Sequence, residues 1–330
     1  MESKINITIL VPVYGVEKYI ERCVRSLFEQ TYENIGYIFV DDCSPDNSIG
    51  VLKRVLCEYP HRIPYVRIIR HNQNRGLGAA RNTAVENCST DFLLHVDSDD
   101  WLDKNVVEML LKKQSETGAD IITYDVKMHF SQKIQIRTKP VFKSNEELVL
   151  ALSCREINGG VCGELIRTSL YKDHDIKIVE GINMSEDFQV NPRLAYFAKN
   201  VSTANGIYYH YFFANQNSYT HNENINTCRQ VWKSYEILED FFSDKDGKYL
   251  IALKKGKKKT LARQLMSGCL HSTGKEIFVA AHQLLRDLSE TNENCMKLQE
   301  KIAIRIPVYW MLRWYMYSIN FLKRTTFYKM

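Results

Sequence analysis

The order of apolar segments in the first 125 residues most restricts how this chain can fold. Short apolar runs rich in β-branched residues alternate with segments whose apolar residues recur at helical spacing. The predicted strands are Ile5–Val11, Gly36–Val40, Val66–Arg70, Phe92–Val96 and Ala119–Tyr124. The predicted helices are Glu17–Gln30, Ser48–Tyr59, Leu77–Asn87 and Lys104–Thr117, the last closed by Gly118. Strands that are apolar throughout and alternate with helices predict an α/β fold whose parallel sheet is covered on both faces.

Charge divides the chain into two parts. Residues 226–330 contain 19 Lys and Arg against 10 Asp and Glu, whereas residues 1–225 contain 25 against 29. The second part is also helical in pattern throughout. A near-neutral first part followed by a basic second part suggests chemistry in the first and attachment to an anionic partner in the second.

Composition excludes several classes of protein. A chain that is 45% hydrophobic and 25% charged is neither disordered nor fibrous. We expect no secretory signal and no membrane-spanning helix, because there is no apolar leader and no uncharged run of about 18 apolar residues. The 9 cysteines include no Cys-x-x-Cys pair, which suits reduced thiols in a cytosolic protein better than a zinc site.

Polar or turn-forming residues follow four consecutive predicted strands, at Pro12–Gly15, Asp41–Ser44, His71–Asn82 and Asp97–Trp101. Turn chemistry alone explains any one of these segments, since Asp, Asn, Ser and Gly favour turns. It does not explain all four together. The carboxyl ends of parallel strands meet at one sheet edge, where such folds bind their ligands. We therefore place the site at this edge.

Asp97-Ser98-Asp99 is the most specific of these segments. In extended backbone the two aspartates point to the same side, and their carboxylates repel each other. A divalent cation removes this conflict, and Mg²⁺ commonly binds through one or two carboxylates together with substrate phosphates. The segment predicts a site for a metal and a diphosphate. The alternative is that Asp103 or Asp100 caps the next helix while the other carboxylates are solvated; we expect Asp103 to be that cap.

The strings ITILVPVYG, VDDCS, NRGLGAARN and HVDSDDWL, at this spacing, resemble the family 2 glycosyltransferases. The resemblance covers residues 5–125 strongly and 158–220 moderately. It implies an inverting enzyme with the GT-A fold, a Rossmann-like, mostly parallel sheet flanked by helices, here with a C-terminal helical extension. Residues 1–125 would bind the nucleotide sugar, residues 126–225 would complete the catalytic domain on the acceptor side, and residues 226–330 would form the basic helical region.

The resemblance also implies roles on the donor side. Tyr14 would stack on the base, with Pro12 beside it, and Asp42 would accept the N3–H of uracil, which makes a UDP-sugar the expected donor. The residues expected near the ribose and phosphates are Asn74, Gly76, Arg81, Asp97 and Ser98, although Arg81 fits equally well as a structural ion-pair partner. Mn²⁺ or Mg²⁺ would bind Asp97 and Asp99. His210 or His221 could complete the metal shell, and of these we retain His221.

Met184-Ser185-Glu186-Asp187-Phe188 resembles the family's G-E-D segment, with Ser185 in place of Gly. The resemblance makes Asp187 the catalytic base and Glu186 its alternative. The competing interpretation is that both acidic residues favour the dipole of a following helix. One base and one displacement at the anomeric carbon give inversion without a protein nucleophile.

The basic tail predicts contact with an anionic membrane surface through residues 254–259 and 302–330. On a helical wheel Val308, Leu312, Tyr315, Ile319 and Leu322 share one face, with Trp310 and Trp314 beside it. The alternatives are a solvated lysine run and a helix packed on the catalytic domain. Membrane contact would suit a saccharide acceptor carried on a lipid diphosphate and a cytoplasmic protein held at the inner face of the membrane.

Three other functions compete with this interpretation. A non-catalytic subunit that binds a sugar nucleotide or polysaccharide could use the same fold, but it would not require Asp97, Asp99 and Asp187. A dinucleotide oxidoreductase is suggested by Gly76-Leu77-Gly78, yet Arg81 occupies the third small position of that fingerprint. Nucleic-acid binding is not expected, because no base-stacking module accompanies the lysine run.

Overall fold

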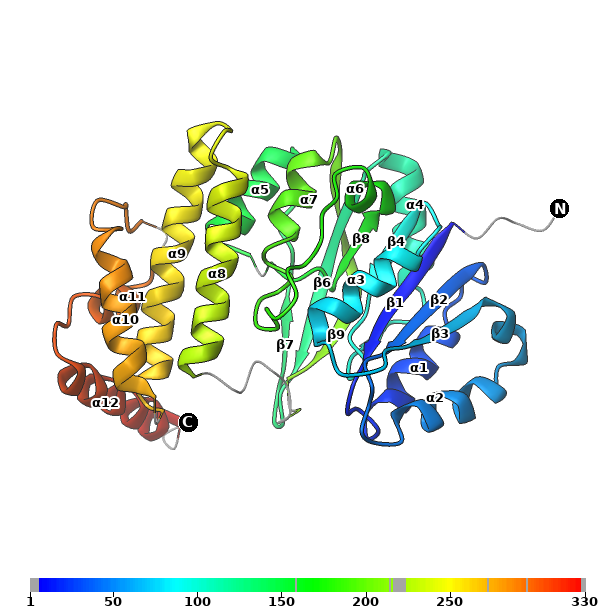
Figure 1. The fold of residues 1–330 in the computed structure, drawn as a ribbon, viewed down its shortest axis with the longest axis horizontal. Helices are drawn as coiled ribbons and strands as arrows, with labels where there is room; N and C mark the ends of the chain where they lie inside the picture. Colours follow the sequence, from blue (N-terminus) through cyan, green and yellow to red (C-terminus); the bar gives the residue numbers. More distant parts are fainter. Residues whose placement is uncertain are drawn as a thin grey trace. The chain divides into compact units, whose positions relative to one another are not determined.

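A computed structural model of the chain describes residues 6–157, 159–213, 215, 224–271, 273–294 and 296–327. The chain forms two compact units. The first consists of Met1–Val149 and Gly159–Ser218, and the second of Leu150–Asn158 and Tyr219–Met330. Figure 1 gives the order of the elements. The predicted division into residues 1–225 and 226–330 remains a prediction.

The strands of the first unit are β1 (Ile7–Val13), β2 (Ile35–Asp41), β3 (Val66–Arg70), β4 (Phe92–His95), β5 (Trp101–Leu102), β6 (Ile121–His129), β7 (Ile134–Arg137), β8 (Glu164–Arg167) and β9 (Val201–Phe212). Its helices are α1 (Ile20–Phe28), α2 (Ser48–Cys57), the 3₁₀ helix η1 (Pro60–Tyr65), α3 (Leu77–Asn87), α4 (Val106–Thr117), α6 (Thr168–Lys172) and α7 (Asn191–Phe197). Helix α5 (Asn145–Ser153) includes residues of both units.

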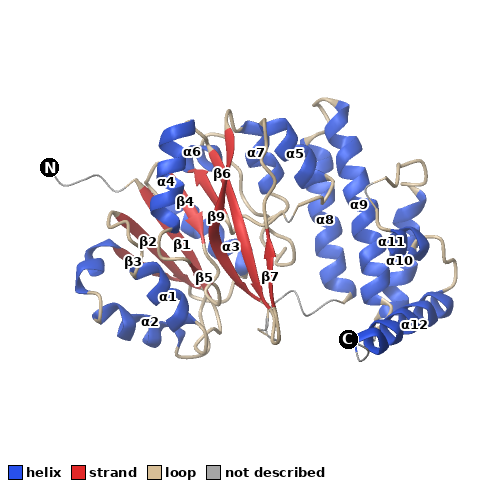
Figure 2. Ribbon diagram, turned by 180° about the vertical axis from the view of Figure 1, so that it is seen from behind, coloured by secondary structure: helices blue, strands red, loops and turns tan. Residues whose placement is uncertain are grey.

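The nine strands found among the described residues form one sheet, in the order β3-β2-β1-β4-β8-β6-β9-β5 with β7 on β6. Neighbouring strands are parallel from β3 to β4. Beyond β4 the pairing is mixed, because β8 runs antiparallel to both β4 and β6 while β9 is parallel to β6. The predicted α/β fold is confirmed, and Figure 2 shows the sheet as a continuous layer with helices around it.

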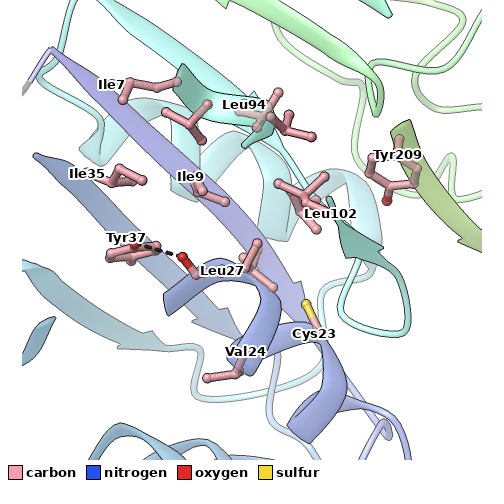
Figure 3. Close-up of a cluster of buried hydrophobic side chains, with 14 of the residues drawn as sticks. Ile7, Ile9, Cys23, Val24, Leu27, Ile35, Tyr37, Leu94, Leu102 and Tyr209 are labelled. Atoms are coloured by element: carbon pink, nitrogen blue, oxygen red, sulfur yellow. Dashed lines mark hydrogen bonds between the residues drawn. The ribbon is translucent and has the colours of Figure 1, made fainter. Parts of the chain in front are cut away.

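Alternation along β1 places apolar side chains on both faces of the sheet. Ile7, Ile9 and Val11 belong to the core that includes residues of α1, α2 and α4, and Figure 3 shows part of it. In this core the Tyr37 hydroxyl donates a hydrogen bond to the Leu27 carbonyl at 2.9 Å. Helix α3 buries its small residues, such as Ala79 and Ala84, outside this cluster. Both faces of the sheet are therefore covered, so its polar strand ends are left for ligands.

The second unit is helical, with α8 (Ile225–Phe241), α9 (Gly247–Gly268), α10 (Gly274–Arg286), α11 (Leu298–Ala303) and α12 (Tyr309–Phe327) around a core of its own. The Trp232 indole N–H donates to Gln264 Oε1 at 2.7 Å between α8 and α9. Within the described residues, none of the helices combines the length and apolar character needed to cross a membrane.

The lysine run 254–259 lies in the middle of α9. Lys258 and Lys259 are buried. The Lys258 ammonium pairs with Glu293 at 3.0 Å, and that of Lys259 donates to the Arg155 carbonyl at 3.0 Å. Lys257 pairs with Glu239 at 2.8 Å. The prediction that 254–259 forms a basic surface is therefore wrong for these three lysines.

Candidate active site

The loops after β1 and β2 lie against each other. The Gly15 N–H donates to Ser44 Oγ at 2.9 Å, and the Val16 N–H donates to Ser48 Oγ at 3.0 Å. Pro12 is buried as the penultimate residue of β1, whereas the Tyr14 side chain just after the strand is 47% exposed. An exposed ring on a tethered loop is available to stack on a planar ligand, which is the geometry expected of Tyr14.

Asp42 joins the second strand-end loop to the third. Its carboxylate lies 2.7 Å from His71 Nδ1 and accepts the backbone N–H groups of Arg75 at 2.9 Å and Gly76 at 2.7 Å. The residue is buried. A carboxylate has about four acceptor positions, so these bonds leave room for one further donor. Asp42 therefore holds the loop in place, and its expected bond to the base stays a prediction.

Gly76 fixes the path of the third loop into α3. Its φ is 89°, and a Cβ there would lie 2.4 Å from Asn183 Oδ1. The neighbouring Gly78 is equally constrained, because a Cβ there would meet Ile178 Cγ2 at 2.6 Å. The start of α3 thus packs closely against residues 178–183, while Asn74 remains exposed before it.

The Asp97–Asp100 segment is bound to the end of β9. Asp99 Oδ2 accepts the Asn215 side-chain amide at 2.7 Å, and burial together with Asp97 raises the pKa of Asp99. Asp100 is buried and accepts the Tyr209 hydroxyl at 2.6 Å and the Phe212 N–H at 2.7 Å. The three aspartates therefore differ in their surroundings: Asp100 is buried and structural, whereas Asp97 and Asp99 are partly exposed. Ser98 between them is buried.

Asp103 is not the helix cap that the sequence suggested. Helix α4 begins at Val106, and its N-cap is Asn105. The Asp103 carboxylate instead accepts the Tyr208 N–H at 3.1 Å and lies 2.8 Å from His210 Nε2. The capping prediction is wrong because the Asp103 carboxylate is bound to Tyr208 and His210 of β9. The other ring nitrogen of His210 lies 2.8 Å from His129, so His210 has neither nitrogen left for a metal.

Arg81 brings the two halves of the site together. Its side chain is 3% exposed, and its guanidinium pairs with Asp97 Oδ1 at 2.7 Å and with Glu186 Oε1. Burial disfavours the charge on Arg81, but Asp97 and Glu186 outweigh this cost and raise its pKa. The ion-pair alternative for Arg81 is thus observed, and a contact with the donor stays a prediction.

Glu186 and Asp187 lie in a turn before α7. Glu186 is buried, and this burial raises the pKa of its carboxyl group. The positive charge of Arg81 acts to lower that pKa, and the negative charge of Asp187 acts to raise it. Asp187 is partly exposed, and its carbonyl accepts the N–H groups of Val190 at 3.1 Å and Asn191 at 3.0 Å. Of the two residues, Asp187 is the more exposed, and exposure suits a base that meets a substrate hydroxyl.

The residues present fit a divalent cation only in part. Across the parts of the chain that the structure describes, no three His, Cys, Asp or Glu side chains form a group that could hold a metal ion. Asp97 and Asp99 supply carboxylate oxygens, and burial, together with the charge of Asp97, raises the pKa of Asp99. This donor set suits Mg²⁺ or Mn²⁺ completed by diphosphate oxygens. The proposed ligand His221 lies outside the described residues.

Sequence reasoning missed several residues of this site. Arg22 in α1 donates to the Asp99 carbonyl at 2.9 Å and lies over the Trp101 ring at 3.7 Å. Asn215 could have been found, because it lies between His210 and His221, the two residues that the resemblance offered for the metal shell. Glu164 in β8 is fully buried and lies within electrostatic reach of Asp187, and nothing in its local pattern suggested that.

Comparison with known proteins identifies relatives of the first unit. The model of the family described as "Glycosyl transferase family 2" matches residues 8–172. Glycosyltransferase GlyA of Streptococcus pneumoniae is 45% identical over 35% of this chain and 16% of its own length. EpsH of Bacillus subtilis is 31% identical over 62% of this chain and 60% of its own length. The matched part of this chain therefore spans less than two thirds of either relative.

Solved structures share the fold. Staphylococcus aureus TarS 1-349 in complex with UDP has a TM-score of 0.55 and 19% identity, covering 90% of both chains. The mannosyltransferase PcManGT of Pyrobaculum calidifontis, in complex with GDP-Man and Mn²⁺, has a TM-score of 0.53 and 13% identity over 94% of this chain and 86% of its own. At these identities the likeness concerns the fold alone.

Proposed function

The chain belongs to glycosyl transferase family 2 and is a glycosyltransferase, and from that premise we propose that it transfers a sugar from a UDP-sugar to a saccharide hydroxyl in bacterial polysaccharide assembly. One observation carries this proposal: Arg81 joins Asp97, at the donor side, to the Glu186–Asp187 turn. The TarS complexes with UDP and UDP-GlcNAc support the choice of uridine, and the TarS name supports a polymer acceptor. A non-catalytic binding subunit would not need Arg81 to connect Asp97 with the Glu186–Asp187 turn.

The strand-end loops bind the donor. Tyr14 stacks on the base beside Pro12, and the remaining acceptor position of Asp42 takes the base N3–H. The exposed Asn74, the start of α3 at Gly76 and the Ser98 backbone face the ribose and diphosphate. The N-terminal amides of α3 favour an anionic group there.

Asp97 and Asp99 would hold a Mn²⁺ or Mg²⁺ ion together with the donor diphosphate, with His221 as a further ligand. When bound, this ion would supply positive charge where the leaving diphosphate becomes more negative. Asp97 also binds Arg81 through Oδ1, so the same carboxylate would serve both the arginine and the ion. Asn215 keeps Asp99 oriented through the bond at Oδ2.

Asp187 accepts the proton of the acceptor hydroxyl while that oxygen attacks the anomeric carbon from the face opposite the diphosphate. The new glycosidic bond forms as the bond to the diphosphate breaks, and the configuration inverts. Glu186 is the weaker candidate for the base, because its carboxylate is buried and paired with Arg81.

A membrane surface is the proposed location of the acceptor, which we place on a lipid diphosphate at the inner face of the cytoplasmic membrane. The contact lies on α12, where Trp310 is 66% exposed, Met311 57% and Trp314 73%. Of the face first expected to meet lipid, Leu312 belongs to the core of the second unit and Tyr315 packs against it, whereas Val308 is 45% exposed. Exposed tryptophans on a helix that carries basic residues favour an anionic membrane interface.

Asp187→Asn tests the catalytic assignment. We expect UDP affinity to stay within about 2-fold and the release of UDP from UDP-GlcNAc, UDP-glucose or UDP-galactose to fall by about 10³-fold, because only the base is lost. Asp173→Asn, at an exposed position after α6, is the matched control. Undiminished release by Asp187→Asn would overturn the assignment, and no release by the parent with any nucleotide sugar would contradict the proposed function.

A further inference from the structure

The guanidinium of Arg81 bonds both to Asp97 and to Glu186. These three residues come from α3, the loop after β4 and the turn before α7, which are far apart in the sequence. Arg81 lies on the buried face of α3 among Gly78, Ala80 and other small residues. Its position is therefore set by helix packing, and the two carboxylates are held to it.

We propose that Arg81 is a positioning residue that fixes the distance between the donor-side carboxylate Asp97 and the base Asp187, acting on Asp187 through Glu186. This inference rests on the proposed function. Glu186 and Asp187 are consecutive in one turn, so an anchored Glu186 side chain limits where the Asp187 carboxylate can lie. A planar guanidinium with two separate N–H groups suits this role, because it can bind two carboxylates in fixed directions at once.

The backbone of the turn explains why such an anchor is needed. Ser185, the residue before Glu186, has a φ of 57°, which is unfavourable for a residue with a side chain. The turn is closed by the bond from the Phe188 N–H to the Ser185 carbonyl at 3.2 Å and by the two bonds to the Asp187 carbonyl. A strained turn persists only when surrounding contacts hold it. The buried pair between Arg81 and Glu186 is such a contact.

The charge balance supports the same role. Arg81 supplies one positive charge against Asp97, Glu186 and Asp187, all of which act on it electrostatically. Without that charge the carboxylates repel each other, and the turn moves away from Asp97. A displacement of about 1 Å between reacting groups costs about 100-fold in rate. The predicted defect is therefore in turnover and not in nucleotide affinity.

The experiment compares Arg81→Lys, Arg81→Met and Glu186→Met in the full chain. Arg167→Lys is the matched control, because Arg167 pairs with Asp120 at 2.5 Å on β8 without joining the site. Calorimetry with UDP and Mn²⁺ measures affinity, and UDP release from the UDP-sugar that the parent uses measures turnover. Hydrogen exchange of the Phe188, Val190 and Asn191 amides reports on the turn without any ligand.

The three site variants should bind UDP within about 3-fold of the parent, release UDP about 100-fold more slowly and exchange the three amides faster. The double variant Arg81→Met/Glu186→Met should release UDP no more slowly than the slower single variant, because both substitutions remove the same contact between Arg81 and Glu186. If UDP affinity falls by the same factor as the rate of UDP release, Arg81 binds the donor directly, and this result would overturn the proposal. Unchanged exchange in the variants would overturn it as well.

Two features keep these outcomes distinct from failure of the proposed function. Arg81→Met can fail to fold, because it leaves two carboxylates without a partner, whereas Arg81→Lys retains the positive charge. The exchange measurement needs no turnover. It therefore tests whether Arg81 holds the turn even if the parent releases no UDP. Absence of UDP release by the parent would contradict the proposed function itself.

Discussion

Ser185 shows how one residue departs from the family pattern and what that costs. Ser185 occupies the position that is glycine in the family's G-E-D segment. Its φ of 57° lies in the region that glycine adopts without strain. Left-handed backbone costs a residue with a side chain about 1–2 kcal/mol. The sequence alone located this position, and the backbone explains why glycine suits it.

Ser185→Gly should therefore stabilise the protein. We expect a gain of about 0.5 kcal/mol in the free energy of unfolding, since relief of strain outweighs the greater freedom of unfolded glycine. Denaturant unfolding measures this change. Ser115→Gly, at an exposed position in α4, is the control and should be destabilising, because glycine weakens a helix interior. A loss of stability in Ser185→Gly equal to that of the control would contradict the argument.

Glu164 makes stability depend on pH. Both carboxylate oxygens are buried, and burial raises the pKa of Glu164 to about 7, against the attraction of Lys139 and a hydrogen bond from the Asn191 side chain. The folded state thus binds the proton more tightly than the unfolded state. The stabilisation by the protonated form is complete below about pH 4.5 and is lost as pH rises through 7.

Glu164→Gln removes this penalty at high pH. The variant should exceed the parent in free energy of unfolding at pH 8, by at most about 3 kcal/mol, because no buried charge is formed. At pH 5 the difference should be much smaller. Denaturant unfolding at the two pH values measures it, and a difference that is the same at both would show that Glu164 is not responsible.

At the scale of elements, most strands and helices up to α4 and the helical character of residues 226–330 were predictable, whereas strands that depend on distant partners were not. β3 and α3 were predicted with their observed bounds, and the other predicted elements up to α4 differ from the structure only at their ends. These elements follow from local periodicity. By contrast β5 has two residues and β9 pairs with β6 across about 80 residues, as in Ile121 with Val201. Such pairing depends on tertiary contacts that no short window contains.

The same limit applies to side chains. The acidic residues of the site were found from their pattern, but the Arg81 bridge between Asp97 and Glu186 depends on the fold. For the lysine run 254–259, the sequence pattern was misleading. In sequence it resembles a charged surface, yet Gly256 within it has no room for a side chain, since a Cβ would lie 2.0 Å from the Ser153 carbonyl oxygen. Lys258 and Lys259, which follow Gly256 in the run, are buried as well.

Helix α12 carries the prediction about membranes. Trp310→Ser/Trp314→Ser should weaken binding to vesicles that contain phosphatidylglycerol by at least about 10-fold, since each tryptophan contributes buried apolar area at the interface. Cosedimentation measures the change. Val279→Ser, at a position in α10 that is 60% exposed, is the control for loss of an exposed apolar side chain. Equal binding by the double variant and the parent would exclude α12 as the contact.

At the scale of the whole molecule, the described residues of the proposed reaction all lie in the first unit. The four strand ends, the Asp97–Asp100 segment and the Glu186–Asp187 turn belong to Met1–Val149 and Gly159–Ser218. The second unit has its own core and holds the basic excess of residues 226–330. This arrangement agrees with a separation between chemistry and attachment.

Calorimetric titration of UDP, with and without Mn²⁺, on the parent and on Asp99→Ala tests the central claim most directly. The account predicts UDP binding that depends on Mn²⁺ in the parent and is weakened at least about 10-fold in Asp99→Ala, because that residue would hold the ion against the diphosphate. UDP binding that is equally strong without Mn²⁺ and in the variant would contradict the metal site. Absence of binding by UDP and by other nucleotides under every condition would contradict the donor site itself.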